Sequence, residues 1–326
     1  MWRPWSRGPD GDATLTAPQN RDIPRKCKLC LYFRVWAELG AELVRIWALA
    51  ALAAAIWLLS VFGQARPGAL PADAPLTQFS AARADAALGR ILGNQAPHPV
   101  GSANAEAVRA RILGELAAMD VHAVTKTGMT CYSQRRWDNN IPCGTVTNIV
   151  AGVAPGAGKA ILLLAHSDSV AAGPGAGDDG SGVAILLEVI RALKARGIEG
   201  GAERPVIALF TDGEEAGMLG AAHYLSDPLQ RARIGAVINV EARGNKGPSY
   251  LFQTSAGNGK LIDLYAARVQ HYATSSLYGE IYKYMPNDTD LTPMLATGAV
   301  RFCCYRRWRP CWCGSGLPPT AKSSWA

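Results

Sequence analysis

Several features that mark common protein classes are missing from this sequence of 326 residues. The glycine-rich run at residues 173–177 fits neither a G-x-G-x-x-G nor a G-x-x-x-x-G-K-[ST] pattern, so a nucleotide-binding loop is not indicated. Cys27 and Cys30 have no second cysteine pair at zinc-finger spacing, and the sequence shows no internal repeat. Histidine is scarce, with five in the chain and none after His271. Only 18% of the residues are charged and 49% are hydrophobic, so the chain can bury a sizeable core.

The formal net charge of +7 is concentrated at the two ends of the chain. Eight lysines and arginines lie in residues 1–45, and four arginines lie in residues 301–326. The part between these ends is close to neutral, so the basic character does not indicate nucleic acid, and we expect no nucleic-acid partner. Residues 1–45 are interpreted instead as a basic segment that flanks a membrane span.

Residues 46–63 carry no charge and form the most apolar run in the chain. At 1.5 Å per residue, eighteen helical residues just cross a hydrocarbon layer of about 30 Å. A buried core helix or a cleaved signal peptide are the alternatives, although about 45 residues precede the run. Because the basic residues come before the span, we expect a cytoplasmic N-terminus. The rest of the chain would then be exported to a periplasmic, extracellular or lumenal compartment, with membrane lipid around residues 46–63.

After the span, the pattern predicts an α/β fold with a mostly parallel central sheet. Residues 64–95 are interpreted as a linker and a first helix, residues 96–300 as the main domain, and residues 301–326 as an atypical tail. Cys131 and Cys143 flank a polar loop, and a disulfide between them is expected if the compartment is oxidising. The expected strands are residues 121–130, 145–153, 160–165, 205–210, 235–240 and 249–254, and the expected helices are residues 80–92, 105–119, 183–196, 216–225 and 260–272.

Metal-binding types of side chain follow three predicted buried strands at the point where each strand ends. His166 follows the first, Glu214 and Glu215 the second, and Glu241 the third. In open α/β sheets, ligands bind at the carboxyl ends of the strands, so we expect these side chains to meet. A set of imidazole and carboxylate ligands without thiolate is typical of catalytic Zn²⁺.

Three aspartates in the following loop belong to the same hypothesis. Asp178 and Asp179 lie between the strand that ends at His166 and the next helix, so they reach the same edge. Asp168 is two residues past His166 and can accept the second imidazole N–H, which would fix the tautomer.

Seven segments of the sequence form a recognisable set: HPVGSAN (98–104), TNIVA (147–151), LLLAHSDSV (162–170), GAGDDGSGVA (175–184), LFTDGEEAGMLGA (209–221), NVEARGNKGP (239–248) and NDTDLT (287–292). Through these segments the chain resembles, from about residue 96 to 299, the zinc aminopeptidases of the M28 peptidase group, and particularly their endoplasmic-reticulum and vacuolar membrane branch. This resemblance implies a three-layer α/β/α zinc-exopeptidase fold and the removal of N-terminal residues from peptides with a free amine.

The resemblance also implies a role for each matching residue. His166 and Glu241 would hold one zinc ion, Glu215 the other, and Asp178 would bridge both. Glu214 would be the general base that takes a proton from a metal-bound water. The loop with Asp288 and Asp290 is expected to border the pocket.

One element of the family pattern is missing from the sequence. The second zinc ion needs another histidine after a late strand, whereas this chain reads RFCCYRRWRPCWCGSGLPPTAKSSWA from residue 301. We expect this tail to lack a regular strand, the sheet to lose its final strand, and the second zinc ion to bind weakly with only Asp178 and Glu215. A changed reading frame or a truncation would explain the composition better than a cysteine-rich metal knuckle.

Three functions remain open at this point. The first is an aminopeptidase with two zinc ions. The second is a single-zinc enzyme similar to glutaminyl cyclase on the same scaffold. The third is a catalytically impaired fragment or a non-catalytic member that lacks the last zinc ligand.

Overall fold

The structure is a computed structural model that describes residues 28–62, 68–132, 141–242, 249–269, 273–285, 287–295 and 300–306. It separates into two units, Met1–Gly63 and Gln64–Ala326. The disulfide expected between Cys131 and Cys143 is present.

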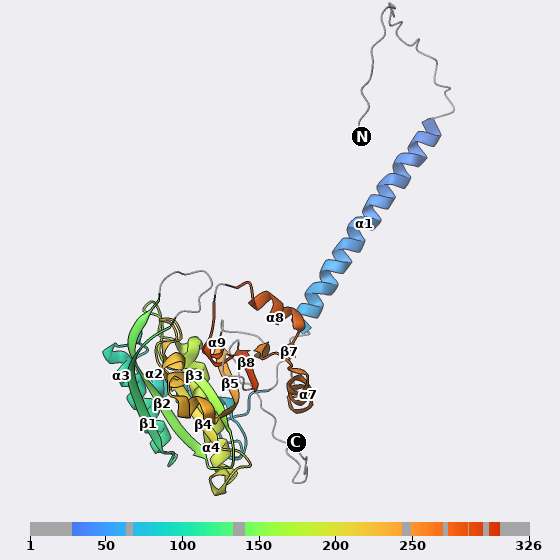
Figure 1. The fold of residues 1–326 in the computed structure, drawn as a ribbon. Coiled ribbons are helices and arrows are strands. Elements are labelled where there is room, and N and C mark those ends of the chain that lie inside the picture. Colours follow the sequence, from blue (N-terminus) through green and yellow to red (C-terminus); the bar gives the residue numbers. More distant parts are fainter. Residues whose placement is uncertain are drawn as a thin grey trace, which may run out of the picture. The chain divides into compact units, whose positions relative to one another are not determined.

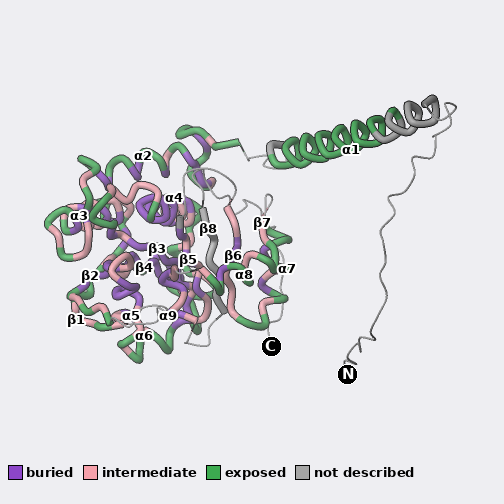
Figure 2. Tube along the Cα trace, turned by 90° about the horizontal axis from the view of Figure 1, so that it is seen from above, coloured by how far each residue is buried: buried purple, intermediate pink, exposed green. Residues whose placement is uncertain are grey.

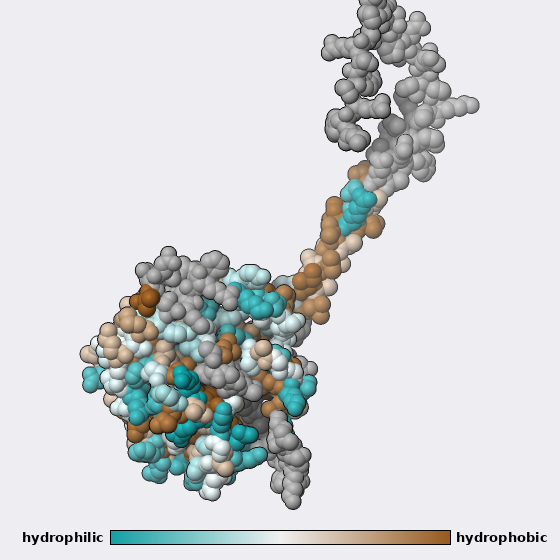
Figure 3. All heavy atoms as spheres, in the orientation of Figure 1, coloured by the Kyte–Doolittle hydropathy of each residue, from teal (hydrophilic) through white to brown (hydrophobic). Residues whose placement is uncertain are grey.

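The first unit contains one long helix, α1 (Lys28–Phe62). Its segment Leu39–Ser60 is long and apolar enough to cross a membrane, and none of it is buried. Figure 3 shows apolar residues along most of the described surface of this helix. This segment begins at Leu39, seven residues before the predicted start at residue 46, because it includes the ion pair between Glu42 and Arg45.

The second unit is built on one sheet of eight strands in the order β1-β2-β4-β3-β5-β8-β6-β7 (Figure 1). The central strands β4, β3, β5 and β8 run parallel, whereas β1 and β2 on one flank and β6 on the other join them through antiparallel pairings. The strands are β1 (Ala123–Cys131), β2 (Cys143–Ala154), β3 (Ala160–His166), β4 (Val206–Thr211), β5 (Ile234–Ala242), β6 (Ser249–Thr254), β7 (Ala273–Thr274) and β8 (Val300–Arg306).

Helices cover both faces of this sheet, which confirms the predicted three-layer α/β/α fold (Figure 2). In β3, Leu163 and Ala165 point to one face, while Leu162 and Leu164 point to the other, as expected for a strand buried on both sides. The first face packs against α2 (Ala81–Leu92), α3 (Ala103–Ala117) and α4 (Ser181–Ala195), and the second against α5 (Leu219–Ser226), α8 (Ser276–Tyr282) and α9 (Leu291–Leu295). Helices α6 (Pro228–Arg233) and α7 (Gly259–Arg268) complete the unit.

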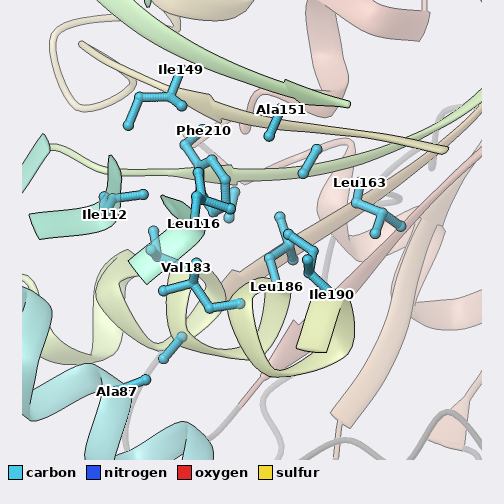
Figure 4. Packing of buried hydrophobic residues seen from close by; sticks show 14 of the residues in the cluster. Ala87, Ile112, Leu116, Ile149, Ala151, Leu163, Val183, Leu186, Ile190 and Phe210 are labelled. Atoms are coloured by element: carbon cyan, nitrogen blue, oxygen red, sulfur yellow. The ribbon is translucent and has the colours of Figure 1, made fainter. Parts of the chain in front are cut away.

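The core on the first face is densely filled by large aliphatic and aromatic side chains (Figure 4). Phe210 of β4 is fully buried among Ile149 of β2, Leu116 of α3 and Leu186 of α4. A fully buried side chain of this size stabilises the fold by about 1.5–3 kcal/mol. The sheet is therefore a rigid base for the loops at the ends of its strands.

The described part of the predicted linker is bound to the domain. Glu188 of α4 is buried, and its carboxylate accepts hydrogen bonds from the Ser80 backbone N–H and from Arg83 and Arg191. Arg83 in turn donates to the backbone carbonyls of residues 72, 74 and 78. The chain from residue 70 to residue 80 is thus fixed to α4 by charged hydrogen bonds.

The expectation that the tail lacks a strand is wrong. Residues Val300–Arg306 form β8, which pairs with β5 in parallel and with β6 in antiparallel orientation. Strand pairing uses backbone groups, and valine, phenylalanine and tyrosine favour extended structure, so the segment pairs despite its unusual composition. The edge of β5 is therefore covered by β8. The final helix that we expected to be missing would fall in residues 307–326, which lie outside the described residues.

Candidate metal centre

The topology brings the predicted ligands to one edge of the sheet. Strands β3 and β5 are parallel neighbours, and Leu164 pairs with Asn239, two residues before His166 and Glu241. Both side chains are buried, and Nε2 of His166 lies 3.4 Å from Oε1 of Glu241. His166 also pairs in register with Thr211 at the end of β4, so the segment with Glu214 and Glu215 leaves the sheet at the same level.

Asp178 and Asp179 have different environments, although both were expected at the site. Asp178 Oδ1 lies 3.1 Å from His166 Nε2, and its side chain is half exposed. Asp179 is fully buried and accepts hydrogen bonds from the backbone N–H groups of His166 (3.3 Å) and Gly182 (3.0 Å). Asp178 is therefore available to a metal ion, whereas Asp179 ties the start of α4 to the end of β3.

Gly182 leaves the space that the Asp179 carboxylate needs to accept these hydrogen bonds. Replacing Gly182 is therefore expected to disrupt them. A Cβ atom at residue 182 would lie 2.3 Å from both carboxylate oxygens of Asp179, so Gly182→Ala must displace that carboxylate. We expect a loss of about 1–3 kcal/mol of stability, as for overpacked cores, together with weaker zinc binding. Denaturant unfolding and zinc titration measure these effects.

The matched control is Gly89→Ala in α2, where an added Cβ meets no atom within 4 Å. Alanine favours helix over glycine by up to about 1 kcal/mol, so this control should be neutral or stabilising. Equal stability and zinc affinity in Gly182→Ala and the control would contradict the role given to Asp179.

Asp168 connects the imidazole with the two glutamates. Nδ1 of His166 lies 3.1 Å from the Asp168 backbone carbonyl and 3.5 Å from its Oδ1. The same carboxylate accepts the backbone N–H groups of Glu214 at 3.0 Å and Glu215 at 3.2 Å. The nearest acceptor for Nδ1 is thus the backbone carbonyl of Asp168, while Nε2 faces the carboxylates of Asp178 and Glu241. The contact with the glutamate backbone was not predicted.

The described residues contain two groups of side chains whose ligand atoms lie within 4.8 Å of one another. The first is His166, Asp178 and Glu241, and the second is His166, Glu214 and Glu215. Oε2 of Glu214 is 4.0 Å from His166 Nε2. The predicted metal ligands and Glu214 thus gather around the His166 imidazole, and Asp168 lies on its Nδ1 side.

The clustered carboxylates repel one another, and those of Glu214 and Glu241 are largely shielded from water. The pKa of Glu214 and that of Glu241 are both raised, mainly by burial. The positive charge of His166 partly opposes this rise. Burial and the charge of Asp178 raise the pKa of Glu215 to about 7. Burial alone would lower the pKa of His166, but Glu241, Asp168 and Asp178 raise it overall. A divalent cation would relieve this repulsion, and the imidazole and carboxylate donors suit Zn²⁺.

Two further buried acidic residues support the site. Asp290 is fully buried and accepts a hydrogen bond from the Thr211 hydroxyl, and burial raises its pKa to about 7. Asp212 binds Arg109 at 3.0 Å and the Thr147 backbone N–H at 2.9 Å. Asp290 was expected only to border the pocket, and Asp212 was missed, although its position directly before the Gly-Glu-Glu sequence is a usable signal.

The other histidines do not complete these groups within the described residues. His98 is buried, and its backbone N–H donates to Ser169 Oγ at 2.9 Å, so it packs under the loop after His166. His223 lies in α5 as predicted, against Gly128 of β1. His271 lies outside the described residues, and His122 is exposed.

Comparison with known proteins gives a consistent result. The sequence profile described as "Peptidase family M28" matches residues 148–312, so the similarity extends past residue 299, where we expected it to end. Mouse "Endoplasmic reticulum metallopeptidase 1" is 36% identical over 150 residues, which are 44% of this chain and 16% of that protein. "Vacuolar membrane protease" of Yarrowia lipolytica is 31% identical over 209 residues, which are 58% of this chain and 20% of that protein. The chain thus spans roughly a fifth or less of the length of these two relatives.

Solved structures share the fold at low sequence identity. A zinc aminopeptidase from Bacillus subtilis has a TM-score of 0.52 and 13% identity, and the match covers 69% of this chain and 85% of that one. A glutaminyl cyclase from Porphyromonas gingivalis has a TM-score of 0.52 and 21% identity, with 69% and 82% covered. Both similarities concern the fold alone.

Proposed function

Because the profile of peptidase family M28 matches half of the chain's length, the chain belongs to that family, and we propose that it is a membrane-anchored zinc aminopeptidase. The observation that carries the proposal is the convergence of the carboxylates of Asp178, Glu214, Glu215 and Glu241 on the His166 imidazole at the end of the parallel strands. Zinc as the metal fits both the family and this donor set.

We assign one zinc ion to His166, Asp178 and Glu241, and a second, weaker one to Asp178 and Glu215. When bound at these residues, Zn²⁺ would supply an acidified water and would polarise the scissile carbonyl. Glu214 Oε2, within 4.0 Å of His166 Nε2, takes the proton of the attacking water and returns it to the leaving amine. Asp168 keeps Glu214 in place through its backbone N–H.

The charge around the site favours a peptide with a free N-terminus as the substrate. Of the proposed ligands, Asp178 is half exposed and Glu215 is only partly buried. A substrate ammonium group that approaches this side is attracted by the negative charge that the metal ions leave uncompensated. An N-terminally blocked peptide lacks that charge and is expected to be a poor substrate.

The proposed topology has a cytoplasmic N-terminus and a peptidase domain on the opposite side of the membrane. The apolar segment Leu39–Ser60 follows most of the basic residues of the N-terminal region. The Cys131–Cys143 disulfide agrees with an oxidising compartment, because disulfides persist there and are rare in the cytosol.

A single-zinc glutaminyl cyclase is the second candidate. It is favoured because, among the residues that the structure describes, one imidazole is shared by both groups of ligands, so that the second metal position has only carboxylates of its own. The two functions differ in product, since a cyclase releases ammonia from an N-terminal glutamine and an aminopeptidase releases an amino acid.

The test uses the full chain purified in detergent and loaded with zinc. Release of nitroaniline from aminoacyl-nitroanilides, lost with a chelator and restored by zinc, is the expected result. The same protein is incubated with a glutamine-initiated peptide, and loss of ammonia without shortening would favour the cyclase. A zinc-loaded protein that does neither would show an impaired member and overturn the proposal.

A further inference from the structure

The loop that carries Glu214 and Glu215 runs from the end of β4 to the start of α5. The register between β2 and β4 ends at the pair of Ile149 and Phe210, so the loop lies beyond the last backbone pairing of these two strands. The proposed reaction needs both glutamate carboxylates at fixed positions. Any attachment of this loop to β2 therefore has to involve side chains.

The first attachment is a ring of hydrogen bonds around Asp212, directly after β4. Its carboxylate accepts the Thr147 backbone N–H of β2 at 2.9 Å and Nη2 of Arg109 in α3 at 3.0 Å. Nε of Arg109 donates to the Thr147 carbonyl at 3.1 Å, so one planar guanidinium joins both residues. The Asp212 and Arg109 side chains are only 3% and 15% accessible. Since a buried ion pair adds little net stability compared with apolar packing, the main consequence of this ring is the fixed position of Asp212.

The second attachment joins the two ends of the loop through Asn148 of β2, which is fully buried. Its amide oxygen accepts the Asp212 backbone N–H at 3.1 Å, and its amide nitrogen donates to the Gly220 carbonyl at 2.8 Å. A Cβ atom at Gly220 would lie 2.5 Å from that amide oxygen and 2.4 Å from the Asp212 carbonyl oxygen, so glycine is needed for this close approach. Residues 212 and 220 are therefore held together on one side chain.

The loop between these two ends is a compact turn. The Met218 backbone N–H donates to the Glu214 carbonyl at 2.7 Å, and the Leu219 N–H donates to the Gly213 carbonyl at 3.0 Å. On the side of β3, the Asp168 carboxylate accepts the Glu214 N–H. Because the turn is closed by its own hydrogen bonds, a displacement of its ends is passed on to Glu214.

We propose that Arg109, Asn148 and Asp212 form a loop clamp that positions Glu214 for proton transfer. The three residues belong to neither group of candidate ligands among the described residues, so they act through the loop and are positioning residues. A displacement of a reacting group by about 1 Å can lower a rate about a hundredfold, so the clamp would set kcat from outside the site. This inference rests on the proposed function, since Glu214 is the base of that reaction.

The test compares full-length Arg109→Lys, Asp212→Asn and wild type, all zinc-loaded in detergent. Arg109→Lys keeps a positive charge beside Asp212 but loses the planar fork that also reaches Thr147. For both variants, we expect kcat for a leucyl-nitroanilide to fall about tenfold to a hundredfold, with little change in KM and in zinc content per chain. The matched control is Arg90→Lys, which changes an arginine bound to Glu115 of α3 through two N–H groups and should leave kcat unchanged.

A double-variant cycle separates positioning of the base from a general defect. When Glu214 is already glutamine, Arg109→Lys should lower the remaining kcat little further, because the effects of residues that act as a unit are not additive. A merely structural role would lower kcat by the same factor in both backgrounds. That result, or an Arg109→Lys variant and an Asp212→Asn variant with the wild-type kcat, would overturn the inference.

Hydrogen exchange of the zinc-loaded proteins distinguishes failure of this inference from failure of the proposed function. Peptides that cover residues 213–219 should exchange faster in Arg109→Lys and Asp212→Asn than in wild type and Arg90→Lys, because the loop opens more often. A wild type that hydrolyses nothing, together with this difference in exchange, would refute the aminopeptidase and leave the clamp in place. Equal exchange of the loop in all four proteins would refute the clamp, whatever the hydrolytic activity.

Discussion

Replacing Glu214 with glutamine is expected to lower kcat by about a hundredfold to ten-thousandfold while zinc stays bound, as for the loss of a general base. The Glu214 carboxylate is largely buried beside the proposed ligands but is not part of the trio of His166, Asp178 and Glu241. Glutamine keeps the shape and cannot accept a proton. The measurement is kcat for a leucyl-nitroanilide together with zinc content per chain.

Glu215→Gln is the matched control for that prediction. It changes the adjacent residue in the same way, but Glu215 is assigned to the second metal position. We therefore expect weaker binding of the second zinc ion, and activity that recovers partly when the zinc concentration is raised. If Glu214→Gln lost zinc as well, or if excess zinc restored its activity, Glu214 would be a ligand and not the base.

Strand periodicity was enough to predict an α/β fold with a mostly parallel sheet, and the strand ends predicted that the candidate ligands meet, whereas the three-layer arrangement was implied by the family resemblance. The continuous apolar run before His166 indicated a strand buried on both faces, and the parallel register with β5 then places Glu241 beside it. Local patterns in the sequence predict where each strand ends, and parallel strands end at the same edge, whereas the pairing of β3 with β5 is seen only in the structure.

Contacts between loops could not be predicted in this way. The Asp168 carboxylate binds the backbone of Glu214, 46 residues further along the chain, and no periodic pattern encodes such a contact. Asp179 looked equivalent to Asp178, but only the folded turn shows that it faces the backbone N–H groups of His166 and Gly182.

The tail shows a different limit of sequence reasoning. Its arginines and cysteines gave no alternating pattern of apolar residues from which a strand could be predicted. A segment between two strands gains backbone hydrogen bonds from both, so it can form a strand without such a pattern. The order of the strands in the sheet, which the sequence did not reveal, decides this placement.

The zinc-free protein is expected to lose stability as the pH rises from about 4.5 to about 7. The pKa of Glu215 and that of Asp290 are both raised to about 7, so the folded state holds more protons than the unfolded state in this window. Stability falls with pH wherever the folded state binds more protons. With a chelator present, the Tm should therefore be lower at pH 8 than at pH 5.5, and Glu215→Gln should reduce this difference.

Zinc should reverse that trend, because the ligands must be deprotonated to bind it. At a zinc concentration a thousandfold above Kd, binding stabilises the folded state by about 4 kcal/mol. Since 1 kcal/mol shifts the Tm of a domain of this size by roughly 2–4 °C, the increase at pH 8 should be about 8–16 °C. His166→Ala should abolish most of it, because His166 belongs to both groups of ligands. A Tm that ignores zinc at pH 8, or a His166→Ala variant stabilised as strongly as the wild type, would remove the physical basis for the assigned metal centre.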